Sequence, residues 1–143
     1  FAPFRALRDM PLAMTAHLVF TAFDRLRPVT TSDVLIRDVL RERIGYKGVI
    51  MSDDITMSAL EGSMEERARS ALSAGCDIVL HCNGIITEMR AVAGAVQKTS
   101  QILAESLAQM DALRRSALSN DEFNPEQARS QLSEVLVGYG DSI

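Results

Sequence analysis

Two adjacent carboxylates, Asp53 and Asp54, stand at the end of an apolar run in the segment GYKGVIMSDDITMSAL, residues 45–60. The run before them, Val49 to Met51, is typical of a buried strand. Successive side chains at a strand end point to different sides, so one carboxylate can face a pocket while the other braces the following turn. The pattern alone leaves three roles open: helix cap, metal pair, or acidic group in a pocket.

The residues around this pair disfavour several kinds of site. No His or Cys stands at the ligand spacing that a tight metal site needs. An aspartyl-phosphate enzyme of the pattern D-x-D-x-T requires a second Asp where Ile55 stands. The chain also lacks the motifs G-x-G-x-x-G, G-x-S-x-G and H-E-x-x-H and a P-loop, so nucleotide-binding, serine hydrolase and zinc protease functions have no support. We therefore predict neither a metal nor a cofactor.

The elements that must position the pair are short apolar strands that alternate with amphipathic helices. We expect strands at 11–20, 48–52 and 76–82, and helices at 31–44, 63–75, about 85–118 and about 125–137. This alternation predicts a parallel α/β sheet. Three strands cannot close a barrel, so the sheet is either open or the last part of a (β/α)₈ barrel.

The carboxyl ends of parallel strands form the functional face in both architectures. Three polar positions fall there: Thr15 to His17, Ser52 to Asp54, and His81 to Asn83. His17 and His81 are the two histidines of the chain, and each, taken alone, is more often a hydrogen-bonded residue at the rim than a catalytic one. A lyase or aldolase needs a lysine at a strand end, and Lys47 lies before its strand rather than after it.

Composition bears on the partners and the compartment. The 143 residues carry a formal net charge of −4, and Lys and Arg are spread along the chain, which argues against nucleic acid or an anionic membrane as partner. No apolar run approaches the ~20 residues of a membrane helix, and the first residues lack the features of a signal peptide. Cys76 and Cys82 lie about 20 Å apart along an extended strand, so we expect free thiols, with Cys82 buried, in a cytoplasmic protein.

Three segments together resemble one family of enzymes. MTAHLVF, LRERIGYKGVIMSDDITMSAL and ALSAGCDIVLHCNG resemble the C-terminal part of the bacterial β-N-acetylglucosaminidases of glycoside hydrolase family 3, the β-hexosaminidases of peptidoglycan recycling. The match runs from about Phe4 to Gly84 and more loosely to the end. Its most specific part is the family's nucleophile strand, G-[FY]-x-G-[VL]-[IL]-x-S-D-D-[LI]-[ST]-M, which residues 45–57 fill throughout.

The resemblance implies a retaining enzyme that removes terminal, non-reducing β-N-acetylglucosamine from muropeptides. The first Asp of the S-D-D motif is the family's nucleophile and falls on Asp53, and Asp54 becomes a bracing residue. Met57 matches the family's methionine near the acetamido group of the sugar, and His17 is expected as a rim residue that contacts the substrate. No metal or cofactor is implied.

One departure from the family concerns the proton donor. The family's acid/base histidine lies in a motif K-H-F-P-G-H-G, which is not in these 143 residues. We therefore expect residues 1–143 to be the C-terminal part of a single barrel domain, about strands six to eight with their helices, and a piece of a longer protein. Its partner would be the N-terminal part of the same barrel, and alone it would expose an apolar edge. The alternative is a non-catalytic α/β module that binds a ligand at the same face.

Overall fold

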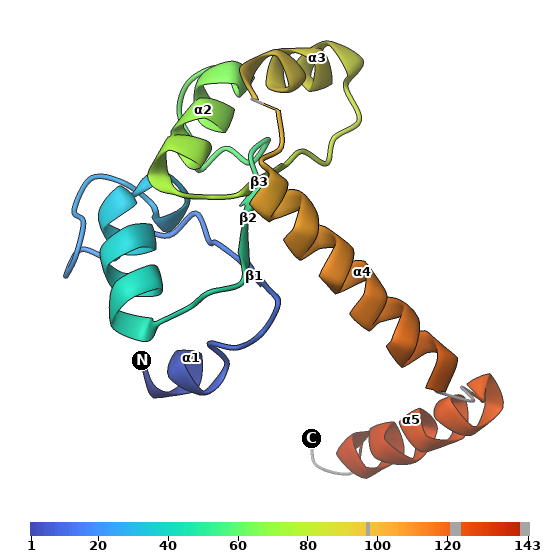
Figure 1. Cartoon of the computed structure of the whole chain (residues 1–143). Coiled ribbons are helices and arrows are strands. Elements are labelled where there is room, and N and C mark those ends of the chain that lie inside the picture. The colour runs from blue at the N-terminus through green and yellow to red at the C-terminus, as the bar shows by residue number, and fades with distance from the viewer. Residues whose placement is uncertain (97, 121–123, 141–143) are drawn as a thin grey trace. The chain divides into compact units, whose positions relative to one another are not determined.

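The computed structural model describes residues 1–96, 98–120 and 124–140. The elements, in chain order, are α1 (Ala2–Ala6), β1 (Leu12–Met14), η1 (Val29–Thr31), η2 (Val34–Ile44), β2 (Val49–Asp54), α2 (Met64–Ala74), β3 (Ile78–Leu80), α3 (Ile86–Ala95), α4 (Gln101–Asn120) and α5 (Pro125–Gly140) (Figure 1). They fall into two units, Phe1–Ala108 and Gln109–Ile143. The first unit contains the sheet and every predicted site residue.

The sheet has the order β1-β2-β3, and both neighbouring pairs are parallel (Figure 1). Leu12 pairs with Val49 and Met14 with Met51, while Met51 also pairs with Ile78 on the other side. The prediction of a parallel α/β sheet is confirmed. The central strand β2 is the one that carries Asp53 and Asp54 at its end.

The outer strands are shorter than the apolar runs that predicted them. Of residues 11–20, only Leu12–Met14 pair as a strand, and β3 covers only three residues of 76–82. Leu12 and Met14 are 38% and 52% exposed, so the apolar run 11–20, whose composition is typical of a strand buried on both faces, does not form such a strand here. Leu12 and Met14 point to the same side of β1, whereas Ala13 points to the other side and packs against buried core residues; β1 also ends the sheet, with β2 as its one neighbour in the described ranges. The expected exposed apolar edge is therefore present.

The two helices that flank β2 in sequence begin and end close to the predicted residues. The helix η2, which has π-type hydrogen bonding, ends at Gly45, and α2 ends at Gly75; both glycines have left-handed backbone. At the start of α2, the Ser63 hydroxyl accepts from the Glu66 N–H and the Glu66 carboxylate accepts from the Ser63 N–H, a capping box. These ends fix the direction in which the chain enters β2 and β3.

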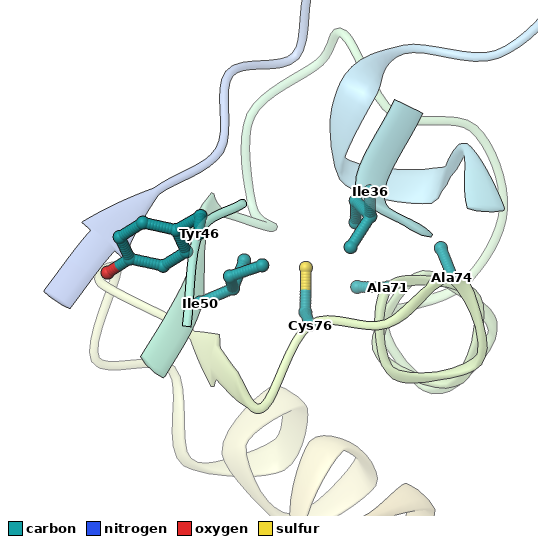
Figure 2. Close-up of a cluster of buried hydrophobic side chains, with 6 residues drawn as sticks. All are labelled: Ile36, Tyr46, Ile50, Ala71, Ala74 and Cys76. Carbon is teal, nitrogen blue, oxygen red and sulfur yellow. The ribbon is translucent and has the colours of Figure 1, made fainter. Parts of the chain in front are cut away.

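Two apolar clusters hold β2 and the segment that follows it. The first joins residues of η2, β2 and α2 (Figure 2): Ile36, Tyr46, Ile50, Ala71, Ala74 and Cys76. The second lies directly beyond the two carboxylates: Ile55, Leu60, Ala68 and Val92. Ile50 and Ile55 are fully buried and bracket residues 51–54, so the strand end is anchored on both sides of the carboxylates.

The helical stretch expected over about 85–118 is two helices, α3 and α4, rather than one. Val96 ends α3 in an extended conformation, and the Ser100 hydroxyl accepts from the Leu103 N–H at 3.2 Å to start α4. A side chain that caps a helix start favours a break over a continuous helix. Helix α5 begins at Pro125, and the Asn124 side chain caps it by accepting from the N–H groups of Glu126 and Gln127. Over the described ranges no helix combines the length and apolar character needed to cross a membrane.

The two cysteines are free thiols in different surroundings. Cys76 is buried in the first cluster, and burial raises the pKa of its thiol to about 12. Cys82 was expected to be buried and is exposed, because β3 ends two residues before it and the chain has already turned toward α3.

Candidate active site

The carboxyl ends of the three strands meet at one edge of the sheet, and Asp54 connects them. Its backbone carbonyl accepts from Nε2 of His17, which follows β1, at 2.9 Å. Its carboxylate accepts from the N–H of Cys82, which follows β3, at 3.2 Å. The parallel topology therefore brings the three predicted positions together, and residue 54 is their common partner.

The Asp54 side chain is occupied by local hydrogen bonds. Oδ1 accepts from the Thr56 N–H at 3.0 Å and Oδ2 from the Thr56 hydroxyl at 2.7 Å, in addition to the bond from Cys82. Burial by itself raises the pKa of Asp54, but the bonds from Thr56 and Cys82 and the nearby His81 outweigh it, so this pKa lies below its usual value. Asp54 is an ionised bracing group with little free acceptor capacity.

This bracing predicts a pH-dependent loss of stability in Asp54→Asn. The pKa of Asp54 is lower in the folded protein than in the unfolded chain, where it is ~3.9. The ionised carboxylate therefore stabilises the fold fully above the unfolded-state pKa. This stabilisation is lost as the pH falls through the lower folded-state pKa. We expect the variant to be less stable than the wild type at pH 7, and the gap to narrow below about pH 4. Urea unfolding at a series of pH values measures this gap. Thr56→Val, which removes one donor, should weaken the pH dependence, whereas a gap that is constant with pH would contradict the assignment.

The Asp53 carboxylate accepts fewer hydrogen bonds than the Asp54 carboxylate in the described part of the chain. Its Oδ1 accepts from the N–H of Asp54 at 2.8 Å, and within the described residues this is the one hydrogen bond of the carboxylate. Asp53 is half-buried and is the next-to-last residue of β2. One carboxylate oxygen is thus fixed in direction while the other has no protein donor in the described part of the chain. A supporting carboxylate is expected to be saturated with hydrogen bonds, as Asp54 is, and a reactive one to keep an oxygen without a donor, as Asp53 does in the described residues.

His17 has both ring nitrogens bonded to the protein. Nδ1 lies 2.7 Å from the hydroxyl of Thr30, and Nε2 lies 2.9 Å from the carbonyl oxygen of Asp54. The prediction that His17 contacts the substrate stays a prediction, but its hydrogen-bonding groups are already used.

Met57 lies three residues beyond Asp54 and is 45% exposed. Its N–H donates to the Asp54 carbonyl at 3.1 Å, and its own carbonyl accepts from Nη1 of Arg67 at 3.1 Å. The backbone is therefore fixed while the thioether remains accessible next to the strand end. This is consistent with the predicted role in substrate binding, which no contact in the structure tests.

The end of β3 contains a second small network. Nε2 of His81 lies 3.3 Å from Oε2 of Glu88, and the Asn83 amide donates to the same oxygen at 2.7 Å. The bond from Asn83 first, and that from His81 after it, lower the pKa of Glu88 despite partial burial. These contacts hold the loop between β3 and α3.

Two residues of these networks have no counterpart in the sequence predictions. Thr30 is fully buried in the short helix η1 and holds His17, and Glu88 is in the first turn of α3 and holds His81 and Asn83. The contact of Glu88 could have been predicted, because an acidic residue that soon follows the polar end of a strand can bond to the side chains there. A threonine in the segment PVTTS carries none. Among the described residues, no group of three or more His, Cys, Asp or Glu side chains could hold a metal ion.

Comparisons with known proteins identify the family to which this sheet belongs. Residues 1–116 match the family model described as the glycosyl hydrolase family 3 N terminal domain. The chain belongs to glycosyl hydrolase family 3. Its three parallel strands form an α/β fragment that matches part of that family's TIM-barrel domain.

Relatives within glycosyl hydrolase family 3 are β-hexosaminidases. The chain is 43% identical over 95 residues to the β-hexosaminidase of Neisseria meningitidis, covering 62% of this chain and 26% of that protein. It is 47% identical over 85 residues to that of Alkalilimnicola ehrlichii, covering 57% and 24%. The chain therefore spans about a quarter of the length of the curated relatives it matches.

Solved structures of glycosyl hydrolase family 3 proteins superpose on the same region. NagZ from Neisseria gonorrhoeae in complex with N-trifluoroacetyl-D-glucosamine has a TM-score of 0.65 and 39% identity, over 76% of this chain and 31% of that one. CbsA from Thermotoga neapolitana has a TM-score of 0.60 and 30% identity, over 85% and 30%.

Proposed function

We propose that this chain is the nucleophile-bearing part of a retaining exo-β-N-acetylglucosaminidase, with Asp53 as the nucleophile. The observation that carries the proposal is a contrast at the end of β2: in the described part of the chain the Asp54 carboxylate accepts three hydrogen bonds and the Asp53 carboxylate accepts one. A nucleophile needs a carboxylate that is fixed in direction and still has a free oxygen, and Asp53 has both properties.

In the proposed reaction, the free oxygen of Asp53 attacks the anomeric carbon from the face opposite the leaving group. The glycosidic bond breaks, the leaving-group oxygen takes a proton from a general acid, and a covalent glycosyl-enzyme forms; water then hydrolyses it with retention. The N–H of Asp54 at 2.8 Å holds the other oxygen of Asp53 throughout. Asp54 remains ionised and immobile, and takes no part in bond making.

The general acid comes, in this proposal, from outside the chain. His17 is bonded at both nitrogens, and the motif K-H-F-P-G-H-G is absent from these residues. We assign the three strands to about the sixth, seventh and eighth of a (β/α)₈ barrel whose N-terminal part supplies the acid and covers the exposed residues of β1. The exposure of Leu12 and Met14 supports a missing neighbour there.

The proposed substrate is a muropeptide with a terminal β-N-acetylglucosamine, hydrolysed during cell-wall recycling in the cytoplasm. Support for an amino sugar comes from NagZ of Neisseria gonorrhoeae, which was crystallised with N-trifluoroacetyl-D-glucosamine. Met57, exposed beside the carboxylates, is the group of this chain that we place next to the acetamido substituent.

Trapping of the covalent intermediate tests the proposal. The full-length protein is incubated with a 5-fluoro N-acetylglucosaminyl donor, which slows hydrolysis of the intermediate, and is then digested for mass spectrometry. We expect a single label on the peptide that contains Asp53. A label on another residue, or turnover without any trapped intermediate, would overturn the assignment.

A second candidate function is binding without hydrolysis. It is favoured by one observation, the absence of the motif K-H-F-P-G-H-G from these 143 residues. A protein that binds N-acetylglucosamine but neither hydrolyses an aryl N-acetylglucosaminide nor takes up the label would support the binding module.

A further inference from the structure

His17 joins the end of β1 to the end of β2 through two short hydrogen bonds. A carbonyl oxygen only accepts, so Nε2 of His17 carries the hydrogen that is donated to the Asp54 carbonyl at 2.9 Å. In the neutral ring, Nδ1 then accepts from the hydroxyl of Thr30 at 2.7 Å. This tautomer follows from the partners, and it leaves no ring nitrogen for a sugar hydroxyl.

The anchor on the other side of His17 is rigid. Thr30 is fully buried; its hydroxyl oxygen can accept from the Thr15 hydroxyl at 2.8 Å, and the Ala16 carbonyl at 3.3 Å is a second, longer acceptor for the one hydrogen that Nδ1 receives. Thr15 is itself tied to β2, because its N–H donates to the Met51 carbonyl at 2.9 Å. The His17 ring is therefore held in place by the buried threonines, and its Nε2 restrains the Asp54 carbonyl.

Residue 54 transmits this restraint to Asp53. Its carbonyl is held by His17, and its carboxylate is held by Thr56 and Cys82. Because the carbonyl and the carboxylate are attached to the same Cα, these bonds restrain the position of the Asp54 nitrogen, whose N–H donates to Oδ1 of Asp53. The chain of contacts runs from a buried threonine to the one hydrogen bond that orients the Asp53 carboxylate.

We infer that His17 is a positioning residue for the Asp53 carboxylate, acting through residue 54, rather than a ligand of the sugar. The inference rests on the proposed function, because it assigns a role in the reaction of Asp53. Removal of the imidazole takes away one of the two hydrogen bonds that the Asp54 carbonyl accepts in the described residues, so the backbone at residue 54 is less tightly restrained and the Asp53 carboxylate is less precisely aligned. Misplacement of a reacting group by about 1 Å costs on the order of 100-fold in rate.

The test uses substitutions in the full-length protein and an aryl N-acetylglucosaminide as substrate. His17→Phe keeps a flat ring but removes both nitrogens, and we expect kcat to fall about 10- to 100-fold with KM changed by less than about threefold. His17→Gln can still present an N–H toward the Asp54 carbonyl and should recover part of the loss. Thr30→Val should lower kcat, whereas Thr31→Val, the same change one position away, should not.

The possible results separate the alternatives. A rise in KM with kcat retained in His17→Phe would make His17 a sugar ligand and overturn the inference. A lower melting temperature with unchanged kcat at assay temperature would make it purely structural and would also overturn it. If His17→Phe does not fold, His17→Gln and Thr30→Val decide the question: a lower kcat with KM nearly unchanged supports a positioning role, and a higher KM with kcat retained contradicts it. Full activity in Asp53→Ala would instead refute the proposed function, whatever the His17 variants do.

Discussion

Replacement of Asp53 by alanine is expected to lower kcat for an aryl N-acetylglucosaminide by about a thousandfold or more in the full-length protein. Without the carboxylate no glycosyl-enzyme can form. The fold should survive, because in the described residues the side chain accepts one hydrogen bond and is only half-buried. Initial rates measure the first effect, and circular dichroism with thermal melting measures the second.

Added azide distinguishes a missing nucleophile from other causes of inactivity. Azide can enter the space left by the carboxylate and attack the anomeric carbon from the same face, so Asp53→Ala should form the α-glycosyl azide from a β-glycoside. Azide should not rescue the His17 variants, which keep Asp53. The matched control is Asp38→Ala, since Asp38 lies on η2 and bonds to its neighbour Arg37. Unchanged turnover in Asp53→Ala without azide would remove the basis of the proposed mechanism.

Gly48→Ala is expected to destabilise the protein by about 1–3 kcal/mol or more, because the backbone leaves no room for a side chain. A Cβ at this position would lie 2.5 Å from the Met10 carbonyl oxygen and 2.7 Å from that of Pro11, and would also clash with the Tyr46 hydroxyl. Two of these neighbours are backbone atoms of the two residues just before β1 and cannot rotate away. The carbonyl of Gly48 is also held by Arg41 Nη1 at 2.6 Å, which restricts relief by a backbone shift.

The same substitution elsewhere in the chain provides the control. Gly94 lies exposed in α3, and a Cβ there would meet no atom within 4 Å. Alanine is favoured over glycine in a helix, and Gly94 is the next-to-last residue of α3, so Gly94→Ala should stabilise the protein slightly, by at most about 0.5–1 kcal/mol. Urea unfolding of both variants therefore measures changes of opposite sign. Equal effects would show that the close approach at Gly48 is not maintained in solution.

The sequence located the strands but not their lengths. The apolar runs around Ala13, Ile50 and Val79 identified three strands, and the alternation with helices predicted their parallel order. An apolar run reports only that side chains avoid water, whereas strand length depends on pairing, and β1 pairs over three residues. The break between α3 and α4 was missed because the apolar spacing continues through it, and the cap at Ser100 outweighed that spacing.

The predictability of the candidate site has a similar limit. The rule that function lies at the carboxyl ends of parallel strands selected Asp53, Asp54 and His17 correctly as neighbours. It could not specify what His17 touches, because one partner is a backbone carbonyl, which no residue type encodes, and the other is Thr30, 13 positions away. Contacts to backbone atoms become visible only once the strands are assembled.

The different surroundings of the two cysteines give the chain an intrinsic labelling site. Cys76 is buried in the core and its thiol has a pKa of about 12, so mild alkylating reagents should not modify it. Cys82 is exposed, and its N–H is bonded to the carboxylate of Asp54. Partial desolvation and the nearby carboxylates of Asp54 and Asp53 raise the pKa of the Cys82 thiol, so labelling is slow but selective. A fluorophore placed there would lie beside the strand end that carries Asp53 and Asp54 and would report changes at that end of the sheet.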